Sequence, residues 1–406
     1  MIPKITLPKV RKLIVVLTSW TFFFLLGYSI ATSSVPEITI NRESPKNRDL
    51  DFSLFWNIWD TLDANYYDNS QLDEANMIYG AIKGMVAAVG DPYTVFLTPR
   101  ENEVTQEDLS GNFEGVGIQI GFRGQQLAVI SPLPGTPAEE AGIKAGDYIV
   151  GIKDEEKEIE RGTTGITLPE AVQLIRGRAG TKVNLTLLRG GSDEPIIVDV
   201  VRKNIDVPSV SLAFVGETRD IAHLRVMKFG AETKAEWDKA VLEILLLNNL
   251  SGVILDLRGN PGGYMQGAVD LSGDFMDANE LVVIEDRGDD RTEELRTNGP
   301  GRLKSEKLVI LADGGSASAS EILAGALREN LGTDIIGMTT FGKGTIQEPM
   351  YLDSGAGLHV TIARWLTPKG NWVNDQGLLP DVEIEDNFDT PEDEQLAKAI
   401  DYLVTN

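Results

Sequence analysis

The 406-residue sequence contains no cysteine, which excludes disulfide bonds, thiolate metal sites and a cysteine nucleophile. It has only two histidines, His223 and His359, so a metal site built on a histidine cluster is excluded as well. Both fall inside strand-like runs away from glycine-rich turns, and we interpret them as structural. Nucleophilic catalysis in this chain would therefore depend on serine, threonine or lysine.

Basic residues are scarce, with 37 Lys and Arg against 62 Asp and Glu and a net charge of -25 at pH 7. An acidic surface repels phosphate backbones, so we expect no nucleic-acid partner. Hydrophobic residues make up 42% and charged residues 24%, as in ordinary globular proteins. The length suggests two or three domains.

One long run lacks any charge: residues 13–31, LIVVLTSWTFFFLLGYSIA. As a helix it would be about 28 Å long, close to the thickness of the hydrocarbon core of a membrane. The basic residues within 1–12, and the lack of any acid before Glu37, predict a cytoplasmic N-terminus and an external remainder. A retained single-pass anchor is favoured because a cleavable signal usually has a shorter apolar run. Cleavage after Ala31, giving a secreted or periplasmic protein, stays open because Ser29 and Ala31 are small.

The rest of the chain divides by texture into a linker and three regions. Residues 32–50 are polar with two prolines and are typical of a linker. Residues 51–109 are predicted to be helical, with a second helix over 73–88 and a turn-rich exit over 90–99. The helical spacing is clearest at Leu54, Phe55, Ile58, Trp59 and Leu62.

Residues 110–205 combine short strands with glycine turns and predict a compact β-rich domain. Its charged run 154–161, DEEKEIER, is interpreted as a solvated loop. Residues 206–406 alternate short apolar strands with helices, which predicts an α/β core with parallel strands. A last helix is expected over 391–403.

The stretch GSASASE (315–321) follows an apolar strand and opens a helix. Ser318 or a neighbouring serine therefore lies at a helix N-terminus, where free N–H groups stabilise developing negative charge. The alternative is an N-cap serine without catalytic function, with Glu321 completing a capping box.

Two further glycine-rich stretches can supply catalytic groups. In FGKGTIQ (341–347), Lys343 lies between glycines, and burial would lower its pKa enough for a neutral general base. RGNPGG (258–263) can direct a backbone N–H at an oxyanion. A solvated lysine and a plain glycine turn are the alternatives. Because each stretch follows an apolar strand, we expect all three to meet at one rim of the core.

These motifs, with TPKG and GLLPDV, resemble the carboxy-terminal processing peptidases, or tail-specific proteases, over about residues 51–385. The resemblance implies a serine endopeptidase with Ser318 as nucleophile, Lys343 as base and Gln347 orienting that lysine. It also implies a catalytic core like the crotonase-type spiral of ββα units. No cofactor or metal ion is implied.

The same resemblance implies an oxyanion hole made by backbone N–H groups. One belongs to Ala319 and the other to Gly263, with Gly262 as the alternative within the RGNPGG loop.

The β-rich domain resembles a PDZ domain inserted between the helices and the core. Its GVGI loop, in which we single out Gly115, Val116, Gly117 and Ile118, would capture the carboxylate of a peptide C-terminus. The following strand would accept the peptide as an added strand. The alternative is a plain glycine-rich entry into a strand. The implied partners are proteins or peptides with accessible C-terminal tails.

We therefore expect an α/β protein with a transmembrane segment, N-terminal helices, an inserted PDZ-like domain and a peptidase core. Its expected function is that of a membrane-anchored, extracytoplasmic Ser/Lys endopeptidase that recognises C-terminal tails. A noncatalytic PDZ adaptor at the membrane and a crotonase-like acyl-transfer enzyme are the alternatives. The substrate and the oligomeric state, including a homodimer or larger assembly, stay open.

The membrane prediction can be tested by deleting residues 1–35. The truncated protein should be soluble and still cleave unfolded peptides, whereas the full-length protein should sediment with membranes and resist extraction by high salt or carbonate. Sequencing the mature N-terminus separates the alternatives. A start at Thr32 would contradict the anchor, and a start at Met1 would contradict cleavage.

Overall fold

The structure is a computed structural model that describes residues 51–405 apart from short gaps at 111, 124–125, 134, 167, 190–193 and 386–391. The expected membrane segment, residues 13–31, and the linker lie outside the described residues and stay predictions. From residue 51 on, no described helix is both long and apolar enough to cross a membrane. The chain forms two compact units, one ending at Asp73 and the other beginning at Glu74.

The described part of the first unit consists of helix α2 (Ser53–Asn65) and a short 3-10 turn, η1 (Asn69–Gln71). The predicted helical periodicity is confirmed in α2. None of its residues is buried, and Leu54, Trp56 and Ile58 are more than half exposed. Its aromatic side chains pack on one another instead, as the 5.1 Å between the ring centroids of Phe55 and Trp56 indicates.

The second unit begins with α3 (Glu74–Ala87), β1 (Val95–Leu97) and α4 (Pro99–Ser110). Helix α3 confirms the prediction for 73–88, but the turn-rich exit predicted for 90–99 is wrong in part. The segment contains β1, which pairs antiparallel with β18 (Gly357–Leu366). That partner is more than 250 residues away, so no local pattern could identify it.

The β-rich region contains a sheet of order β3-β4-β5-β7-β8, with β6 beside β5, over a buried apolar cluster. A short ladder between β2 and β9 joins the two ends of the region. Strand β3 pairs only with β4, so it is an edge strand. The elements are β2 (Asn112–Gly115), β3 (Ile118–Arg123), β4 (Gln126–Pro132), α5 (Pro137–Glu140), β5 (Tyr148–Asp154), β6 (Ile159–Gly162), α6 (Leu168–Ile175), β7 (Lys182–Leu188), β8 (Ile196–Val201) and β9 (Lys203–Asp206).

The interpretation of DEEKEIER as a solvated loop is wrong at both ends. Asp154 ends β5 and is 1% exposed, because its carboxylate pairs at 2.7 Å with the equally buried guanidinium of Arg202. Residues 159–162 form β6. Nothing within the run indicates that Asp154 is buried, because its partner Arg202 lies 48 residues further along the chain.

The core contains a sheet of order β10-β11-β12-β15-β16-β19, in which every pair is parallel except the antiparallel edge pair β10–β11. This confirms the predicted α/β core with parallel strands. The elements are β10 (Val210–Val215), β11 (Ile221–Val226), α7 (Thr233–Leu245), β12 (Gly252–Asp256), α8 (Met265–Ser272), β15 (Leu308–Ala312), α9 (Ala319–Leu331), β16 (Ile335–Gly337), β19 (Val382–Glu383) and α10 (Glu394–Thr405).

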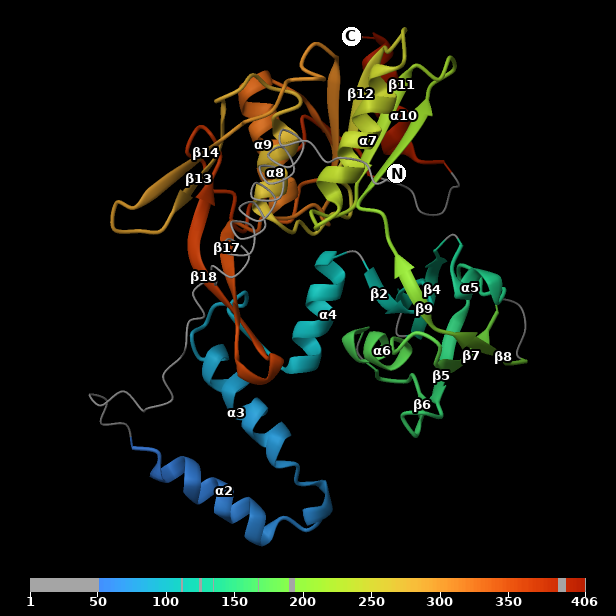
Figure 1. The fold of residues 1–406 in the computed structure, drawn as a ribbon, viewed down its shortest axis with the longest axis vertical. Coiled ribbons are helices and arrows are strands. Elements are labelled where there is room, and N and C mark those ends of the chain that lie inside the picture. The colour runs from blue at the N-terminus through green and yellow to red at the C-terminus, as the bar shows by residue number, and fades with distance from the viewer. Residues whose placement is uncertain are drawn as a thin grey trace, which may run out of the picture. The chain divides into compact units, whose positions relative to one another are not determined.

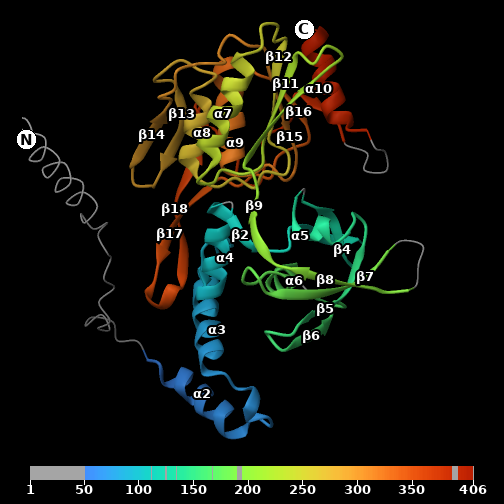
Figure 2. The ribbon, with the colours of Figure 1, turned by 45° about the vertical axis from the view of Figure 1, so that its right-hand side comes forward.

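Helices cover both faces of this sheet, with α7, α8 and α9 on one side and α10 on the other (Figures 1 and 2). Successive residues of β12 alternate between the two faces. Val253 and Leu255 pack with α7–α9, whereas Ile254 packs with Ala399 and Leu403 of α10. Because the sheet is buried on both faces, its central strands β12 and β15 are apolar over most of their length.

A second, antiparallel sheet has the order β1-β18-β13-β14, with β17 paired to β18. Its remaining elements are β13 (Leu281–Asp286), β14 (Thr292–Arg296) and β17 (Thr345–Tyr351), with a 3-10 turn, η2 (Asp353–Gly355), between β17 and β18. Strand β17 begins two residues after Lys343, so this sheet positions the predicted base. The crotonase-type spiral stays a prediction.

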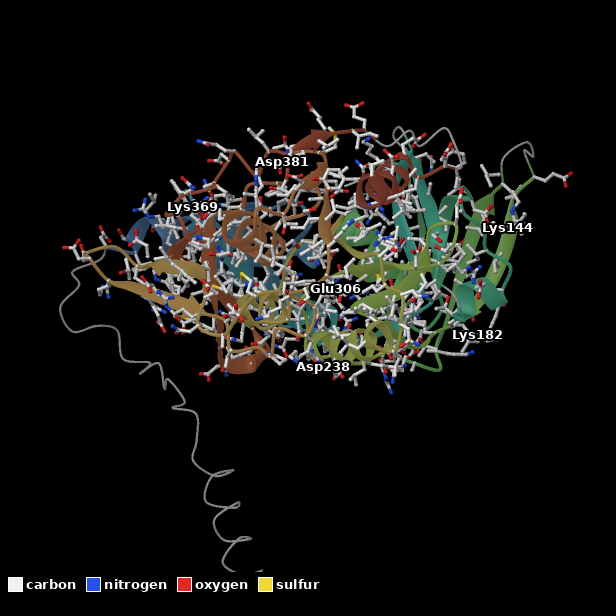
Figure 3. All side chains as sticks on the ribbon, turned by 90° about the horizontal axis from the view of Figure 1, so that it is seen from above. Lys144, Lys182, Asp238, Glu306, Lys369 and Asp381 are labelled. Carbon is white, nitrogen blue, oxygen red and sulfur yellow. The ribbon has the colours of Figure 1, made fainter. Side chains whose placement is uncertain are left out.

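Charged side chains of both signs lie on the outside of the molecule, among them the exposed Lys144, Lys369 and Asp381 (Figure 3). Buried polar side chains are fewer, and several gather in the loops that follow β12, β15 and β16. They include Asn260, Ser316, Ser320, Glu321 and Thr340.

Candidate active site

Three loops that follow parallel strands lie against one another. RGNPGG follows β12, GSASASE follows β15, and residues 338–344 follow β16. The carboxyl ends of parallel strands meet at the same edge of a sheet. Ala317 N–H donates to the Asn260 carbonyl at 2.9 Å, and Phe341 N–H donates to the Ser316 carbonyl at 3.0 Å. The three predicted stretches therefore meet at one rim of the core, as expected.

Ser318 immediately precedes α9 and has φ 56° and ψ -115°. Residues other than glycine rarely adopt this strained conformation, which tends to occur at functional sites. Glu321 reaches back to accept the Ser318 N–H at 2.9 Å, as the capping-box alternative predicts. The N-cap role does not exclude nucleophilic attack, because a hydroxyl that accepts a hydrogen bond still carries its own proton.

The serines on either side of Ser318 are buried and hydrogen-bonded. Ser316 Oγ donates to the Leu257 carbonyl at 2.8 Å, and Ser320 Oγ donates to the Asn260 carbonyl at 2.9 Å. Both hydroxyls tie the GSASASE loop to the RGNPGG loop. Only Ser318 of the three is partly exposed.

Glu321 connects the serine loop to the lysine loop. Its fully buried carboxylate accepts four hydrogen bonds, two on each oxygen. Ser318 N–H and Lys343 N–H bind Oε2 at 2.9 and 3.0 Å. Gly342 N–H and Thr340 Oγ1 bind Oε1, both at 2.6 Å. A single side chain thus fixes the backbone of both predicted catalytic residues.

The Lys343 ammonium lies 5.0 Å from the centre of the Tyr93 ring and makes no hydrogen bond or ion pair with another described residue. Burial lowers the pKa of Lys343 below its ordinary value, although the carboxylates of Asp91 and Glu321 act in the opposite direction. Partly buried and without a counter-ion in contact, this amine is suited to accept a proton.

The turn that carries Lys343 is held on every side. The indole N–H of Trp365 donates to the Lys343 carbonyl, and that of Trp372 donates to the Gly344 carbonyl, both at 2.8 Å. Asp375 N–H donates to the Gly342 carbonyl at 2.9 Å. A side chain at either glycine would collide, since a Cβ on Gly344 would lie 2.5 Å from the Trp372 indole nitrogen.

Two backbone N–H groups near Ser318 have no acceptor among the described residues: those of Gly263 and Ala319. The Gly262 N–H, by contrast, already donates to Asn260 Oδ1 at 2.9 Å. A Cβ on Gly262 would lie only 2.8 Å from Ser318 Cβ, so its backbone closely approaches the serine. This geometry favours Gly263 over Gly262 as the donor from this loop.

Gln347 lies on β17 without contacting Lys343. Its amide nitrogen donates to Thr345 Oγ1 at 2.9 Å and to Thr361 Oγ1 at 3.1 Å. No described residue donates a hydrogen bond to the side-chain carbonyl oxygen of Gln347, so this oxygen can accept one from Lys343.

The two histidines lie on strands. His223, on β11, contacts Asp256 Oδ2 at 2.9 Å. Burial, and to a lesser extent the charge of Lys343, lower the pKa of His359 on β18. Among the residues that the structure describes, no group of three or more metal-ligating side chains is placed to hold a metal ion.

The predicted peptide-binding loop lies between β2 and the edge strand β3. The Val116 and Gly117 carbonyls accept hydrogen bonds from Ala138 N–H and Leu133 N–H, both at 2.9 Å. The N–H groups of Val116 and Gly117 have no acceptor among the described residues. Gly117 has φ 78°, and a Cβ there would collide with Thr136 at 2.4 Å.

Sequence reasoning missed the contributions of Asp91, Tyr93, Trp365 and Trp372 to the lysine environment, and it considered Glu321 only as a helix cap. The signal for Tyr93 was weak, because GDPYT looked like an ordinary turn. Nothing local connects Glu321 with residues 340–343.

Comparison with known proteins agrees with these observations. Residues 220–384 match the model of peptidase family S41, residues 129–189 match a PDZ domain, and residues 18–100 match the activating protease CtpB N-terminal domain. The chain is 32% identical to the carboxy-terminal processing protease CtpA of Bacillus subtilis, covering 90% of this chain and 77% of that protein. It is 34% identical to the carboxy-terminal-processing protease of Bartonella bacilliformis, covering 89% and 82%.

Among solved structures, the chain is similar to a photosystem II D1 C-terminal processing protease. The sequence identity is 29% and the TM-score is 0.54, covering 82% of this chain and 92% of the other.

Replacing Glu321 with glutamine tests its connecting role. One amide nitrogen would then face two of the four donors, so the free energy of unfolding should fall by about 2–4 kcal/mol in urea denaturation. Peptidase activity should fall at least about tenfold at a temperature where the variant is folded. Glu329→Gln is the matched control, because Glu329 lies on the same helix and accepts three hydrogen bonds from the 367–371 turn. Equal losses of activity in both variants would contradict the prediction.

Proposed function

Since this chain belongs to the carboxy-terminal processing proteases of peptidase family S41, we propose that it is a membrane-anchored, extracytoplasmic endopeptidase with a Ser318/Lys343 dyad. Its PDZ domain is proposed to bind the C-terminal tails of the protein substrates. The serine-type peptidase activity and the PDZ domain follow from the family. The catalytic residues, the membrane anchor and the location are the parts that we propose.

The observation that carries the proposal is the shared hydrogen bonding of Ser318 N–H and Lys343 N–H to one carboxylate, that of Glu321. It fixes the backbones of Ser318 and Lys343, 25 positions apart in the sequence, against the same group. A nucleophile and a base held by a common partner are expected where one activates the other.

In the proposed reaction the Ser318 hydroxyl attacks the scissile carbonyl carbon while neutral Lys343 takes its proton. The resulting oxyanion accepts hydrogen bonds from the N–H groups of Gly263 and Ala319. Lys343 then protonates the leaving amine, and the C–N bond breaks to leave an acyl-enzyme. Water activated by the same amine hydrolyses the ester and regenerates Ser318.

Gln347 is proposed to orient the base. Because both of its N–H groups are engaged by Thr345 and Thr361, its carbonyl oxygen is the atom available to accept a hydrogen bond from Lys343. A fixed acceptor would restrict the rotation of the lysine chain without adding a charge that raises its pKa.

Capture of a C-terminal tail is supported by the loop before β3. The Val116 and Gly117 carbonyls are engaged, and their N–H groups are the ones left for a carboxylate. The free edge of β3 can pair with an extended peptide, with Gly115 and Ile118 flanking the loop. A noncatalytic adaptor would need only this peptide-binding loop. That alternative function therefore leaves the arrangement of Ser318 and Lys343 unexplained.

Ser318→Ala should abolish peptide cleavage because it removes the attacking oxygen, and it should lower the thermal midpoint by only a few degrees because the same oxygen also caps α9. Ser316→Ala and Ser320→Ala are controls that should keep substantial activity, measured as release of peptides from an unfolded protein, because each loses a buried hydrogen bond but not the attacking oxygen. An inactive Ser316→Ala with an active Ser318→Ala would place the nucleophile at Ser316 instead.

Lys343→Arg should be as inactive as Lys343→Ala, because an arginine cannot release its proton in a protein. For the unmodified protein, burial lowers the pKa of Lys343, so the neutral base gains population as pH rises. The rate of cleavage should therefore rise with pH and level off above an apparent pKa below about 10.4, the value of a free lysine. Near-normal turnover by Lys343→Arg would show that the residue acts as a fixed positive charge.

A further inference from the structure

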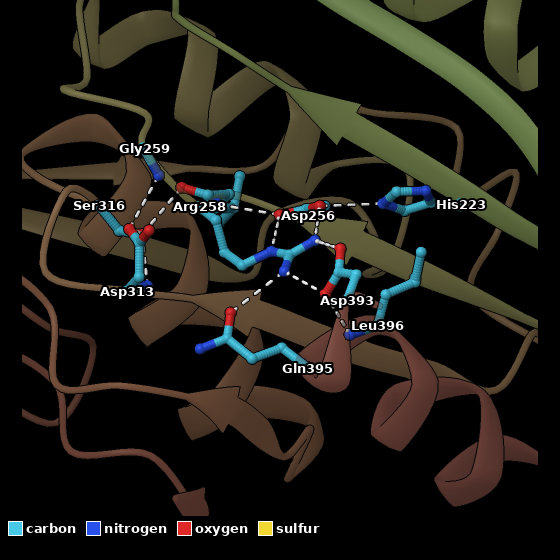
Figure 4. A network of polar contacts seen from close by, with 10 residues as sticks. His223, Asp256, Arg258, Gly259, Asp313, Ser316, Asp393, Gln395 and Leu396 are labelled. Atoms are coloured by element: carbon cyan, nitrogen blue, oxygen red, sulfur yellow. Dashed lines mark hydrogen bonds and ion pairs between the residues drawn. The ribbon is translucent and has the colours of Figure 1, made fainter. Parts of the chain in front are cut away.

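The side chain of Arg258, the first residue of the RGNPGG loop, is at the centre of a polar network that reaches α10 (Figure 4). Its guanidinium is 11% exposed and uses all five of its N–H groups. Two donate to Asp256 at 2.9 and 2.7 Å, and two to Asp393 at 2.8 and 2.9 Å. The fifth donates to Gln395 Oε1 at 3.1 Å.

The Asp256 side of this network belongs to the sheet. Its carboxylate is fully buried at the end of β12 and also contacts His223 Nε2 at 2.9 Å. Desolvation would raise the pKa of Asp256, but hydrogen bonds from His223 and Arg258 outweigh it and hold the pKa below its usual range. The carboxylate therefore stays charged and forms a fixed support for the arginine.

The Asp393 side belongs to α10. Asp393 Oδ1 also accepts the Leu396 N–H at 2.8 Å, so the carboxylate both caps the helix and binds the arginine. Gln395 is 3% exposed, and its amide nitrogen donates to the Ile384 carbonyl at 2.8 Å. Ala399 and Leu403 anchor the helix on the far face of the sheet. Arg258 is thus held from both sides by rigid elements.

Beyond Arg258 the same loop leads to the proposed oxyanion hole. Gly259 N–H donates to Asp313 Oδ1 at 2.8 Å, which ties the loop to the start of the serine loop (Figure 4). Gly263, five residues after the arginine, carries the N–H without an acceptor. Because the loop is short, a displacement at Arg258 would also shift the Gly263 N–H. Small displacements of catalytic groups lower the rate strongly.

We propose that α10, with Asp393 as its N-terminal cap, holds the RGNPGG loop in its productive position by binding Arg258 through Asp393 and Gln395. Arg258 and Asp393 are then positioning residues for the reaction, although neither touches the substrate. The inference rests on the proposed function, because it assumes that the Gly263 N–H stabilises the oxyanion.

A purely structural ion pair is the competing interpretation, and buried ion pairs are in general weak evidence for stability. The two interpretations differ in what a conservative substitution changes. A structural pair affects unfolding alone, whereas a positioning pair lowers kcat with little effect on KM, since the oxyanion exists only in the transition state and intermediates.

The test compares Arg258→Lys and Asp393→Asn with Arg302→Lys as the matched control. Arg302 also binds a buried carboxylate through two nitrogens, that of Asp274 at 2.7 and 2.6 Å, but it lies outside the three catalytic loops. Lysine keeps the positive charge but cannot form the bidentate hydrogen bonds that arginine makes with a carboxylate. Asparagine at 393 keeps the helix cap and loses the charge.

Arg258→Lys and Asp393→Asn should each lower kcat about tenfold, with KM changed less than twofold, whereas Arg302→Lys should keep kcat. A peptide aldehyde, whose adduct with Ser318 carries an oxyanion, should bind about tenfold more weakly to the first two variants. Binding of an uncleaved peptide in the Ser318→Ala background should not change. The double variant should be no slower than Arg258→Lys, because the residues act through one contact.

Wild-type kcat in both Arg258→Lys and Asp393→Asn, or an equal loss in Arg302→Lys, would overturn the positioning role. Failure of the proposed function would look different, since Ser318→Ala assayed in parallel would then remain active.

Discussion

The buried carboxylate of Glu321 is the interaction on which the arrangement of the active site depends. It accepts hydrogen bonds from four donors in two loops, and it is fully removed from water. A charge in such a position is stable only when it is fully hydrogen-bonded. The two loops therefore cannot separate without leaving this charge unsatisfied. The backbones of Ser318 and Lys343 are thus held near each other by the fold before any substrate binds.

The rest of the site follows from the parallel sheet. Strands β12, β15 and β16 end at the same edge, so the loops after them are neighbours. Glycines let these loops approach more closely than side chains would allow, most clearly at Gly262 against Ser318. The strained backbone of Ser318 and the partly buried Lys343 both cost free energy, and the surrounding hydrogen bonds stabilise them. Arg258 extends the same support to α10.

Much of this could be predicted from local sequence. The parallel core, most of its helices and the meeting of the three glycine-rich loops follow from apolar strands that alternate with helical segments. The residues whose structure was predicted wrongly depend on partners that are distant in the sequence. The burial of Asp154 depends on Arg202, which is far along the chain, so the local sequence does not indicate it. Strand β1 is likewise not indicated locally, because its partner β18 is distant in the sequence. Tyr93 and Glu321 acquire their roles only when residues 91–93, 318–321 and 340–343 come together, which no periodicity encodes.

The central claim of the proposed function is that partial burial lowers the pKa of Lys343 and lets it act as a neutral base toward Ser318. Titration of Lys343 followed by NMR tests it most directly, with ¹³C-labelled lysine in the inactive Ser318→Ala variant and the resonance assigned by its loss in Lys343→Arg. The account predicts an apparent pKa below about 10.4, the value of a free lysine. A Lys343 that titrates at or above the value of a free lysine would contradict it.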